Sequence, residues 1–331
     1  MNKQGFRTML QRPGYKLTEE QMKASMAIAE RFDAYLSGKA PTAENAWNFS
    51  KTLIREGSNT RENYLALVRY CLFIKNHAMY VAMLELVDGG EVGDNLYRRV
   101  AERFGQEVRD EIFAGIGVAP YGTPTPEKPA YMQPVIERLE VKVGEQACKD
   151  FLSTCLRSLS DEGYLPEREK YRQAGNIDAY LVQRKEALVA ELEACLREGR
   201  PFYAQEITEE VIAYFRNDPE MEGGVRVGNI VYESKIPYQT KQYLAETDPV
   251  LMGYYYCHCP WAREAIRRGN VKLSAAFCNC SAGAHKKTFD VIFGQPLKVE
   301  VVESILKGDN RCRFAIYLPK EAVVNKKESK E

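Results

Sequence analysis

Apolar side chains recur at helical spacing through the first two hundred residues. After Thr18, which has Gln21 at capping-box distance, they follow every three or four positions until Gly38. A second amphipathic pattern spans 42–55. Over 63–87 the apolar positions fall on nearly every side, which predicts a helix buried on more than one face. This part of the chain is therefore expected to be helical.

Two segments rich in proline and glycine interrupt the helical pattern. Four prolines within 119–130 predict an extended linker. A second boundary is expected at 217–224, which holds Asp218-Pro219 and a Gly-Gly pair. Further helices are expected over 92–116, near 131, over 145–159 and from Asn176 to Gly199. The sequence thus predicts a helical region over 1–216, with the linker inside it, and a separate domain over 217–331.

Beyond the second boundary the alternation changes to the period of a strand. Residues 225–232 alternate about Gly228-Asn229, which is typical of a hairpin. The aromatic segment 251–257 also reads as a strand. Residues 297–305 and 311–318 alternate on either side of a Gly-Asp-Asn turn. Helices are expected over 260–268 and 282–293. The fold class predicted is α+β, a helical N-terminal region followed by a small α+β domain with an antiparallel sheet.

Charge and composition narrow the classes of partner. Among 331 residues, 46 basic side chains balance 46 acidic ones, so no net field attracts nucleic acid or an anionic membrane surface. No uninterrupted apolar run approaches the roughly 20 residues that a membrane helix needs, and no apolar signal core follows the N-terminal charges. We expect a cytoplasmic protein with no nucleic-acid or membrane partner. Nine cysteines in a reducing compartment do not predict a disulfide framework.

Candidate chemistry is concentrated near the C-terminus. Five of the nine cysteines and two of the three histidines fall within 257–312. The five are Cys257, Cys259, Cys278, Cys280 and Cys312. They are candidate metal ligands, with zinc the leading metal and iron the alternative. On an extended chain both sulfurs of a C-x-C pair lie on one face. A reactive thiolate without metal, and small side chains that merely pack, remain open alternatives.

Two of these cysteines are also candidate nucleophiles. Cys259 precedes Pro260, and Cys280 precedes the helix expected from Ala282, so each should lie at a helix N-terminus. The positive end of a helix dipole favours a thiolate. His285 follows within two turns and is the candidate general acid or base.

Ligand-binding residues are suggested around the same cysteines. Tyr254 and Tyr256 would share one face of the expected strand and could line an aromatic pocket. Arg263 and Lys286 could hold a carboxylate or phosphate. Packing of the tyrosines in a core, and a solvated face for the cations, are the alternatives. The other cysteines are expected to be packing residues: Cys71, Cys148, Cys155 and Cys195.

From Val225 to Pro319 the chain resembles the 4-vinyl reductase domain, a small-molecule-binding α+β module. The segments that carry the resemblance are C-x-C-S-A-G and F-G-Q-P-L-K-V-E-V-V-E-S-I-L-K-G-D-N-R-C-R-F. The ending is also similar to that of the L-2-amino-thiazoline-4-carboxylic acid hydrolase family. With Y-Y-Y-C-H-C-P-W-A-R-E, the whole pattern looks like a bacterial family of unknown function within this group.

The resemblance implies part of a zinc site. Cys278 and Cys312 match the first and last ligands of the zinc-bearing sensory members. Ser304 and Val301 occupy the positions of the cysteine and glutamate that complete the set in those members. The site would therefore need substitute ligands from Cys257, Cys259 or Cys280. The chain has no phosphate-binding G-x-x-x-x-G-K-[ST] loop, so a sensory ATPase role is not implied.

Two functions follow from these observations. One is a binding module that holds a small acidic or aromatic molecule beside a metal-binding, cysteine-rich site, with the helical region shaping the pocket or a homodimer interface. The other is a hydrolase of a small carboxylate-bearing substrate, acting through a thiolate or a metal-bound water. A structural protein whose cysteines only pack is the third interpretation.

Overall fold

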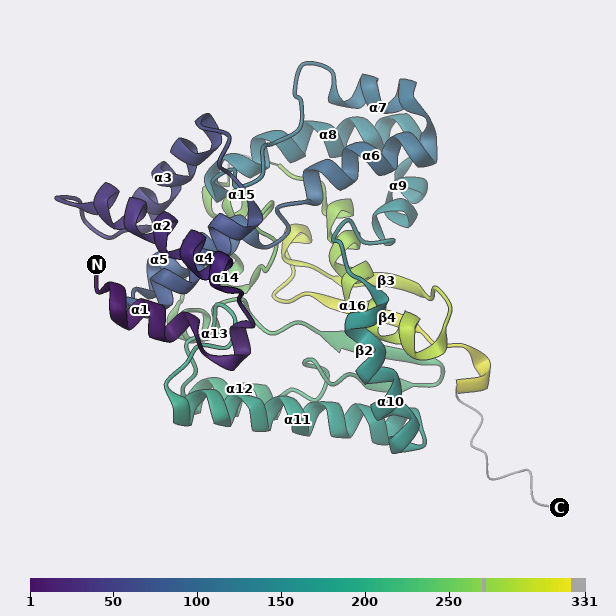
Figure 1. Ribbon diagram of the computed structural model, residues 1–331. Helices are drawn as coiled ribbons and strands as arrows, with labels where there is room; N and C mark the ends of the chain where they lie inside the picture. Colours follow the sequence, from purple (N-terminus) through teal and green to yellow (C-terminus); the bar gives the residue numbers. More distant parts are fainter. Residues whose placement is uncertain (270–271, 323–331) are drawn as a thin grey trace. The chain divides into compact units, whose positions relative to one another are not determined.

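The computed structural model describes residues 1–269 and 272–322, and the chain divides into two compact units (Figure 1). They are Met1–Met132 and Gln133–Glu331, here called the N-terminal and C-terminal units. The division lies inside helix α8, Lys128–Val143, just after the proline-rich segment 119–130. The sequence placed its domain boundary at 216/217, a position that lies within the C-terminal unit.

The N-terminal unit consists of helices. They are α1 Lys3–Leu10, α2 Glu19–Leu36, α3 Ala43–Arg55, α4 Arg61–Phe73, α5 His77–Val87, α6 Val92–Phe104 and α7 Gln106–Phe113. The capping box expected at the start of α2 is present, since Thr18 and Gln21 each accept a hydrogen bond from the other's backbone N–H. This confirms the sequence signal for that helix.

Two helices expected as single elements are each split in two. The pattern over 63–87 breaks after Phe73, where Lys75 has φ 55° and the Asn76 side chain caps α5 by accepting from the Met79 N–H. The pattern over 92–116 breaks at Gly105, which has φ 98°. A helix that is apolar on every side hides such a break, because two buried helices in series have the same composition.

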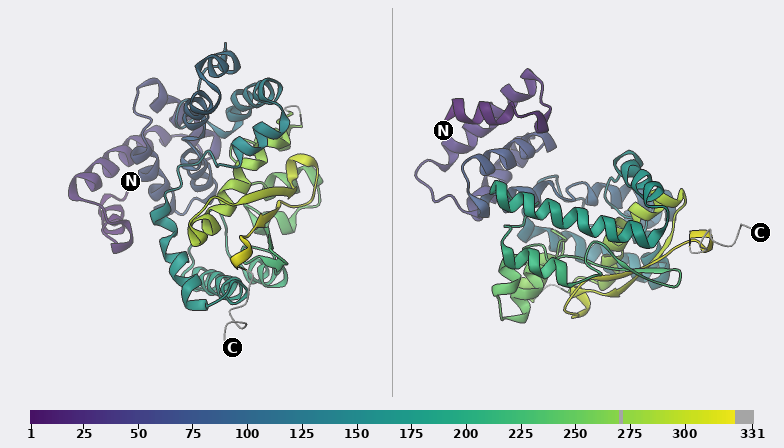
Figure 2. Two further views of the ribbon diagram at one scale, coloured as in Figure 1. Left: turned by 90° about the vertical axis from the view of Figure 1, so that its right-hand side faces the viewer. Right: turned by 90° about the horizontal axis from the view of Figure 1, so that it is seen from below.

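The C-terminal unit combines helices with a sheet. Its helices are α9 Glu145–Leu152, α10 Leu165–Ala174, α11 Ile177–Glu198, α12 Glu209–Asn217, α13 Thr240–Ala245, α14 Pro249–Tyr256, α15 Arg263–Arg268 and α16 Cys278–Phe293. The teal helix α11 is seen at full length in the right view of Figure 2. It begins after the Asn176 cap and ends at Gly199 in the left-handed conformation, as expected.

The sheet has four antiparallel strands in the order β1-β2-β4-β3. The strands are β1 Val225–Val227, β2 Ile230–Ser234, β3 Lys298–Glu303 and β4 Arg313–Tyr317. Both expected hairpins are present: β1 and β2 meet about Gly228-Asn229, and β3 pairs with β4 with an irregularity between Val301 and Glu303. The α+β class is therefore confirmed.

Helix α16 packs on one face of this sheet. Its C-terminal half supplies Phe289 and Ile292 to an apolar cluster that includes Val231 of β2 and Phe314 and Ile316 of β4. Burial of these side chains is the main force that holds the helix against the strands. The N-terminal half of α16 faces the same sheet with a different kind of side chain.

The aromatic segment 251–257, expected as a strand, is mostly helix α14. Asp248 caps it by accepting from the Val250 and Leu251 N–H groups, and Pro249 occupies the first position. The strand prediction was wrong because it relied on the aromatic residues of the segment and did not take account of the helix start signal at Asp248 and Pro249. The next helix, α15, begins at Arg263 rather than Pro260, so Cys259 lies in the turn before it.

No helix among residues 1–269 and 272–322 combines the length and apolarity needed to cross a bilayer.

Candidate functional site

Polar side chains replace apolar ones where the first turns of α16 face the sheet. Val231 and Glu233 of β2 are two residues apart, so both side chains point to the face that α16 covers. Lys235 follows directly after the strand. Val231 packs in the apolar cluster, Glu233 approaches His285, and Lys235 donates to Ser281. The contacts therefore change from apolar to charged toward the N-terminus of α16.

Glu233 is the most deeply buried charge of this region, with none of its surface exposed. Arg184 Nη2 of α11 lies 3.0 Å from its Oε1, and His285 Nδ1 lies 3.5 Å from the same oxygen. The His285 ring packs on Phe314 with 4.7 Å between centroids. Burial alone would raise the pKa of Glu233, but the charges of Arg184 and His285 outweigh it and lower the pKa to about 2.

These close contacts leave hydrogen-bonding capacity unused. Neither carboxylate oxygen of Glu233 receives a correctly oriented hydrogen bond from any described residue, although Arg184 and His285 are near. Arg184 Nη1 likewise has no acceptor within the described chain. Buried polar atoms without partners are rare in folded proteins and call for an explanation. A bound polar molecule that donates to Glu233 and accepts from Arg184 would provide one.

Lys235 links these residues to the cysteines. Its Nζ donates to Ser281 Oγ at 2.8 Å, and its carbonyl oxygen accepts from the Tyr256 hydroxyl at 2.5 Å. It forms no ion pair with a carboxylate of the described residues. Burial raises the pKa of Cys278 to about 12, while the positive charge of Lys235 acts in the opposite direction on Cys278 and on Cys312. An anion at this position would be stabilised by the same charge.

Four cysteines from three segments of the chain lie within electrostatic range of one another near Lys235. They are Cys257, Cys259, Cys278 and Cys312, here called the thiol group. Burial raises the pKa of Cys257 well above its usual value, and negative charge on any of the other three would raise it further. Each of these three thiols therefore lies near enough to Cys257 to affect its pKa.

The donor types of the thiol group fit a soft metal ion, but their spacing does not. Within the part of the chain that the structure describes, no three side chains of His, Cys, Asp or Glu lie close enough to hold an ion. Ser304, which the resemblance aligns with a zinc ligand, is fully buried and donates to Cys278 Sγ at 3.3 Å. A hydroxyl thus lies beside Cys278 at this position.

Cys280 does not belong to the thiol group. Residues two apart on a helix point about 200° apart, so Cys278 and Cys280 project from opposite sides of α16. The expectation that both sulfurs of this pair share a face does not hold, because the segment is helical rather than extended. Cys280 Sγ instead accepts a hydrogen bond from the Leu156 N–H at 3.2 Å and contacts Cys155.

The expected ligand-binding cations are engaged within the protein. Arg263 is fully buried between the rings of Tyr238 and Tyr254, each 4.3 Å from its guanidinium carbon, and donates to Gln239 Oε1 at 2.8 Å. Burial lowers the pKa of Arg263 to about 9.

Lys286 is similarly occupied, since its Nζ lies 2.5 Å from Asp290 Oδ2. The Tyr256 ring is buried in the core, and its hydroxyl bonds the backbone of Lys235. The contacts of Arg263, Lys286 and Tyr256 are thus those of structural residues, and Lys235 is the cation placed beside the thiols.

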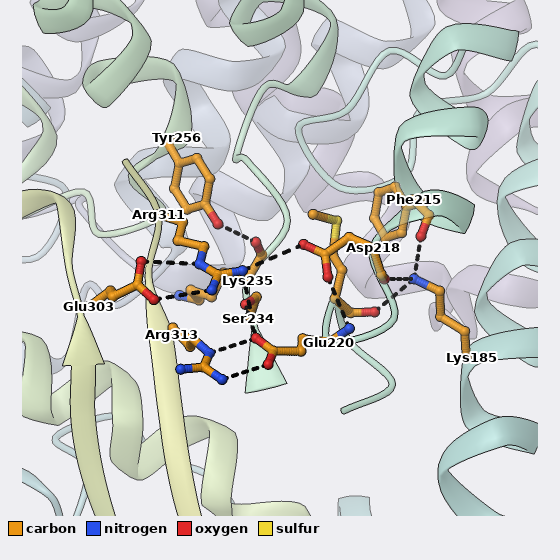
Figure 3. A network of polar contacts seen from close by, with 11 residues as sticks. Lys185, Phe215, Asp218, Glu220, Ser234, Lys235, Tyr256, Glu303, Arg311 and Arg313 are labelled. Atoms are coloured by element: carbon orange, nitrogen blue, oxygen red, sulfur yellow. Dashed lines mark hydrogen bonds and ion pairs between the residues drawn. The ribbon is translucent and has the colours of Figure 1, made fainter. Parts of the chain in front are cut away.

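A network of hydrogen bonds and ion pairs connects the end of β2, which Lys235 follows, with the start of β4, which Cys312 precedes (Figure 3). Arg313 donates twice to the Glu220 carboxylate at 2.6 Å, and Ser234 Oγ donates to Glu220 at 3.2 Å. Lys185 Nζ donates to the carbonyl oxygens of Asp218 and Met221. A second arginine pair completes it, Arg311 with Glu303 at 3.1 Å. Paired arginine–carboxylate contacts of this kind restrict the geometry of both partners.

His285 and the cysteines of the thiol group were expected from the sequence, whereas Glu233, Arg184 and Lys235 were not. One signal was available: in V-Y-E-S-K the charged residues 233 and 235 fall at every second position after Val231, so they continue the face that Val231 begins. A charge on the buried face of a strand is costly unless it is paired. The partner of Glu233, on a distant helix, carries no local signal.

A family of unknown function (DUF6144) matches residues 234–324. The matched segment includes Lys235, the thiol group and His285, and it begins one residue after Glu233. No curated protein and no solved structure is significantly similar to the chain.

Proposed function

We propose that the C-terminal unit binds a small molecule that carries both hydrogen-bond donors and an acidic group. The observation that carries this proposal is the buried Glu233 carboxylate without oriented donors, beside Arg184 Nη1 without an acceptor. The N–H groups of a ligand would donate the missing hydrogen bonds to the Glu233 carboxylate. The acidic group of the ligand would pair with Arg184 or Lys235. The protein is proposed to act in the cytoplasm, where its nine cysteines, all free, stay reduced.

A direct test uses L-2-amino-thiazoline-4-carboxylate, which has amino donors at one end and a carboxylate at the other. Calorimetric titration of the full chain is expected to detect binding, and Lys235→Met is expected to weaken it at least about tenfold, because one charge-assisted contact of about 1.5–3 kcal/mol is lost. Lys287→Met is the matched control, since Lys287 lies on α16 and pairs with Asp161. Absence of binding to the unmodified chain, or equal weakening by both variants, would contradict the proposal for this ligand class.

A soft metal ion at the thiol group is a separate part of the proposal, and it requires these sulfurs to move closer together than they lie in the described chain. Zinc or iron would replace the thiol protons and bind sulfur, which a cluster of buried thiols favours. Elemental analysis of protein purified without a histidine tag is expected to give one zinc or iron per chain. The metal should be lost in Cys312→Ser and retained in Cys280→Ser, because Cys280 faces away. Substoichiometric metal in the unmodified protein would reject this part and leave the ligand proposal standing.

Hydrolysis is the second candidate function. The observation in its favour is that Glu233 lies beside His285 Nδ1, the arrangement in which a carboxylate orients a general base. Of the candidate nucleophiles, Cys259 lies in the thiol group, whereas Cys280 points to the other side of α16. Turnover of the thiazoline carboxylate, lost in His285→Gln while binding persists, would support a hydrolase. Binding without turnover would leave a binding module.

A further inference from the structure

Two thiols meet on the side of α16 opposite the thiol group. Cys155 follows α9, and Cys280 lies in the first turn of α16. The Leu156 N–H, next in the chain after Cys155, donates to Cys280 Sγ at 3.2 Å, and Cys155 is the main influence on the pKa of Cys280. Only 5% of Cys155 and 7% of Cys280 is exposed. Two chain segments more than a hundred residues apart thus place their sulfurs together.

The backbone around this pair is shaped for close approach. Cys155 adopts a left-handed conformation with φ 65°, which is uncommon for a residue with a side chain. The turn that contains it lies directly on α16 at Gly283, where a Cβ atom would stand 2.3 Å from Ser153 O and 2.8 Å from the Cys155 nitrogen. Only a glycine allows the helix and the turn to come this near. The Leu156 N–H bonded to Cys280 Sγ holds the same contact.

We propose that Cys155 and Cys280 form a redox-active dithiol that a small hydroperoxide oxidises to a disulfide. One sulfur attacks the peroxide oxygen, and the O–O bond breaks to give a sulfenic acid and, for hydrogen peroxide, one water. The second thiol displaces the sulfenic oxygen, which leaves as a second water as the S–S bond forms. Both sulfurs are oxidised, the peroxide is reduced, and each thiol proton ends in water. A dithiol reductant reverses the reaction.

The disulfide would join the turn after α9 to the first turn of α16. That helix also carries Cys278, Ser281 and His285, so the cross-link would hold one side of the candidate site. Formation of the disulfide does not depend on the proposed ligand. An effect of the disulfide on ligand affinity would rest on the proposed function, so the cross-link is tested in the absence of ligand.

The test treats the full chain with hydrogen peroxide, blocks the remaining thiols and maps the proteolytic peptides by mass spectrometry. The reaction is run at pH 8.5, because contact with Cys155 and burial raise the pKa of Cys280. We expect a peptide pair joined through Cys155 and Cys280, lighter by two hydrogens and separated by dithiothreitol.

The cross-link should be lost in Cys155→Ser and in Cys280→Ser and kept in Cys195→Ser, whose thiol is buried in α11. Serine is close in size to cysteine, and a thermal melt shows whether each variant is folded. Sulfinic acid at Cys280 without a cross-link, a disulfide between other cysteines, or nine unmodified thiols would each overturn the proposal.

Discussion

Glutamine in place of Glu233 is expected to destabilise the C-terminal unit by about 3–5 kcal/mol, since removal of one partner leaves a buried charge uncompensated. Glu233 is fully buried 3.0 Å from Arg184, and glutamine keeps its shape but not its charge. Urea unfolding can follow this unit alone in a Trp47→Phe background, where the buried Trp261 is the remaining tryptophan. A loss below about 1 kcal/mol would show that the pair is not buried as described.

The same pair predicts how stability depends on pH. The pKa of Glu233 is lowered to about 2 in the folded protein, below the usual 4.5, so its ionised form is preferred when folded. Its contribution is complete above pH 4.5 and is lost as the pH falls toward 2. The difference between the unmodified protein and Glu233→Gln should therefore shrink as unfolding is measured from pH 7 to pH 3. A difference that grows on acidification would contradict the assignment.

A double variant separates the cost of an unpaired charge from loss of shape. With Arg184→Met and Glu233→Leu together, no buried charge is left without its partner, although His285 loses its carboxylate. Replacement of a buried pair by apolar residues is often neutral, so we expect the double variant to be more stable than Glu233→Gln. If the two pairing groups serve ligand binding rather than stability, the double variant should fold well and fail to bind the thiazoline carboxylate.

Helix caps and tight turns, which depend on residues close together in the sequence, were predicted correctly. The caps at Thr18 and Asn176, and the hairpin turn at Gly228-Asn229, lie where the pattern placed them. Where two signals competed, composition misled: the tyrosines before Cys257 suggested a strand, whereas Asp248 and Pro249 start a helix. The helical geometry of α16 then sent Cys278 and Cys280 to different partners.

The candidate site could be located but not assembled from the sequence. The crowding of cysteines predicted a site in this segment, and four of the five lie within electrostatic range of one another in the structure. Its charges are weakly marked in the sequence: Arg184 is one of many charged residues on a long helix, and only the alternation in V-Y-E-S-K indicates Glu233. Their pairing depends on how α11 and α16 pack against the sheet, which is a tertiary property.

Alanine in place of Gly283 is expected to cost about 2–3 kcal/mol. The added Cβ would meet Ser153 O at 2.3 Å and the Cys155 nitrogen at 2.8 Å, both backbone atoms, so the turn and the helix must separate. The higher helix propensity of alanine returns at most about 1 kcal/mol. Urea unfolding followed through Trp261 measures the net loss.

The control for this substitution is Gly163→Ala in the same unit, where a Cβ would meet no atom within 4 Å, and its effect should stay within about 0.5 kcal/mol. Separation at Gly283 would also move Cys155 away from Cys280, because the Cys155 nitrogen is one of the two atoms displaced. A folded Gly283→Ala protein should therefore form the Cys155–Cys280 cross-link more slowly than Gly163→Ala does. Equal rates in the two variants would mean that the sulfurs meet without the close packing of this turn on α16.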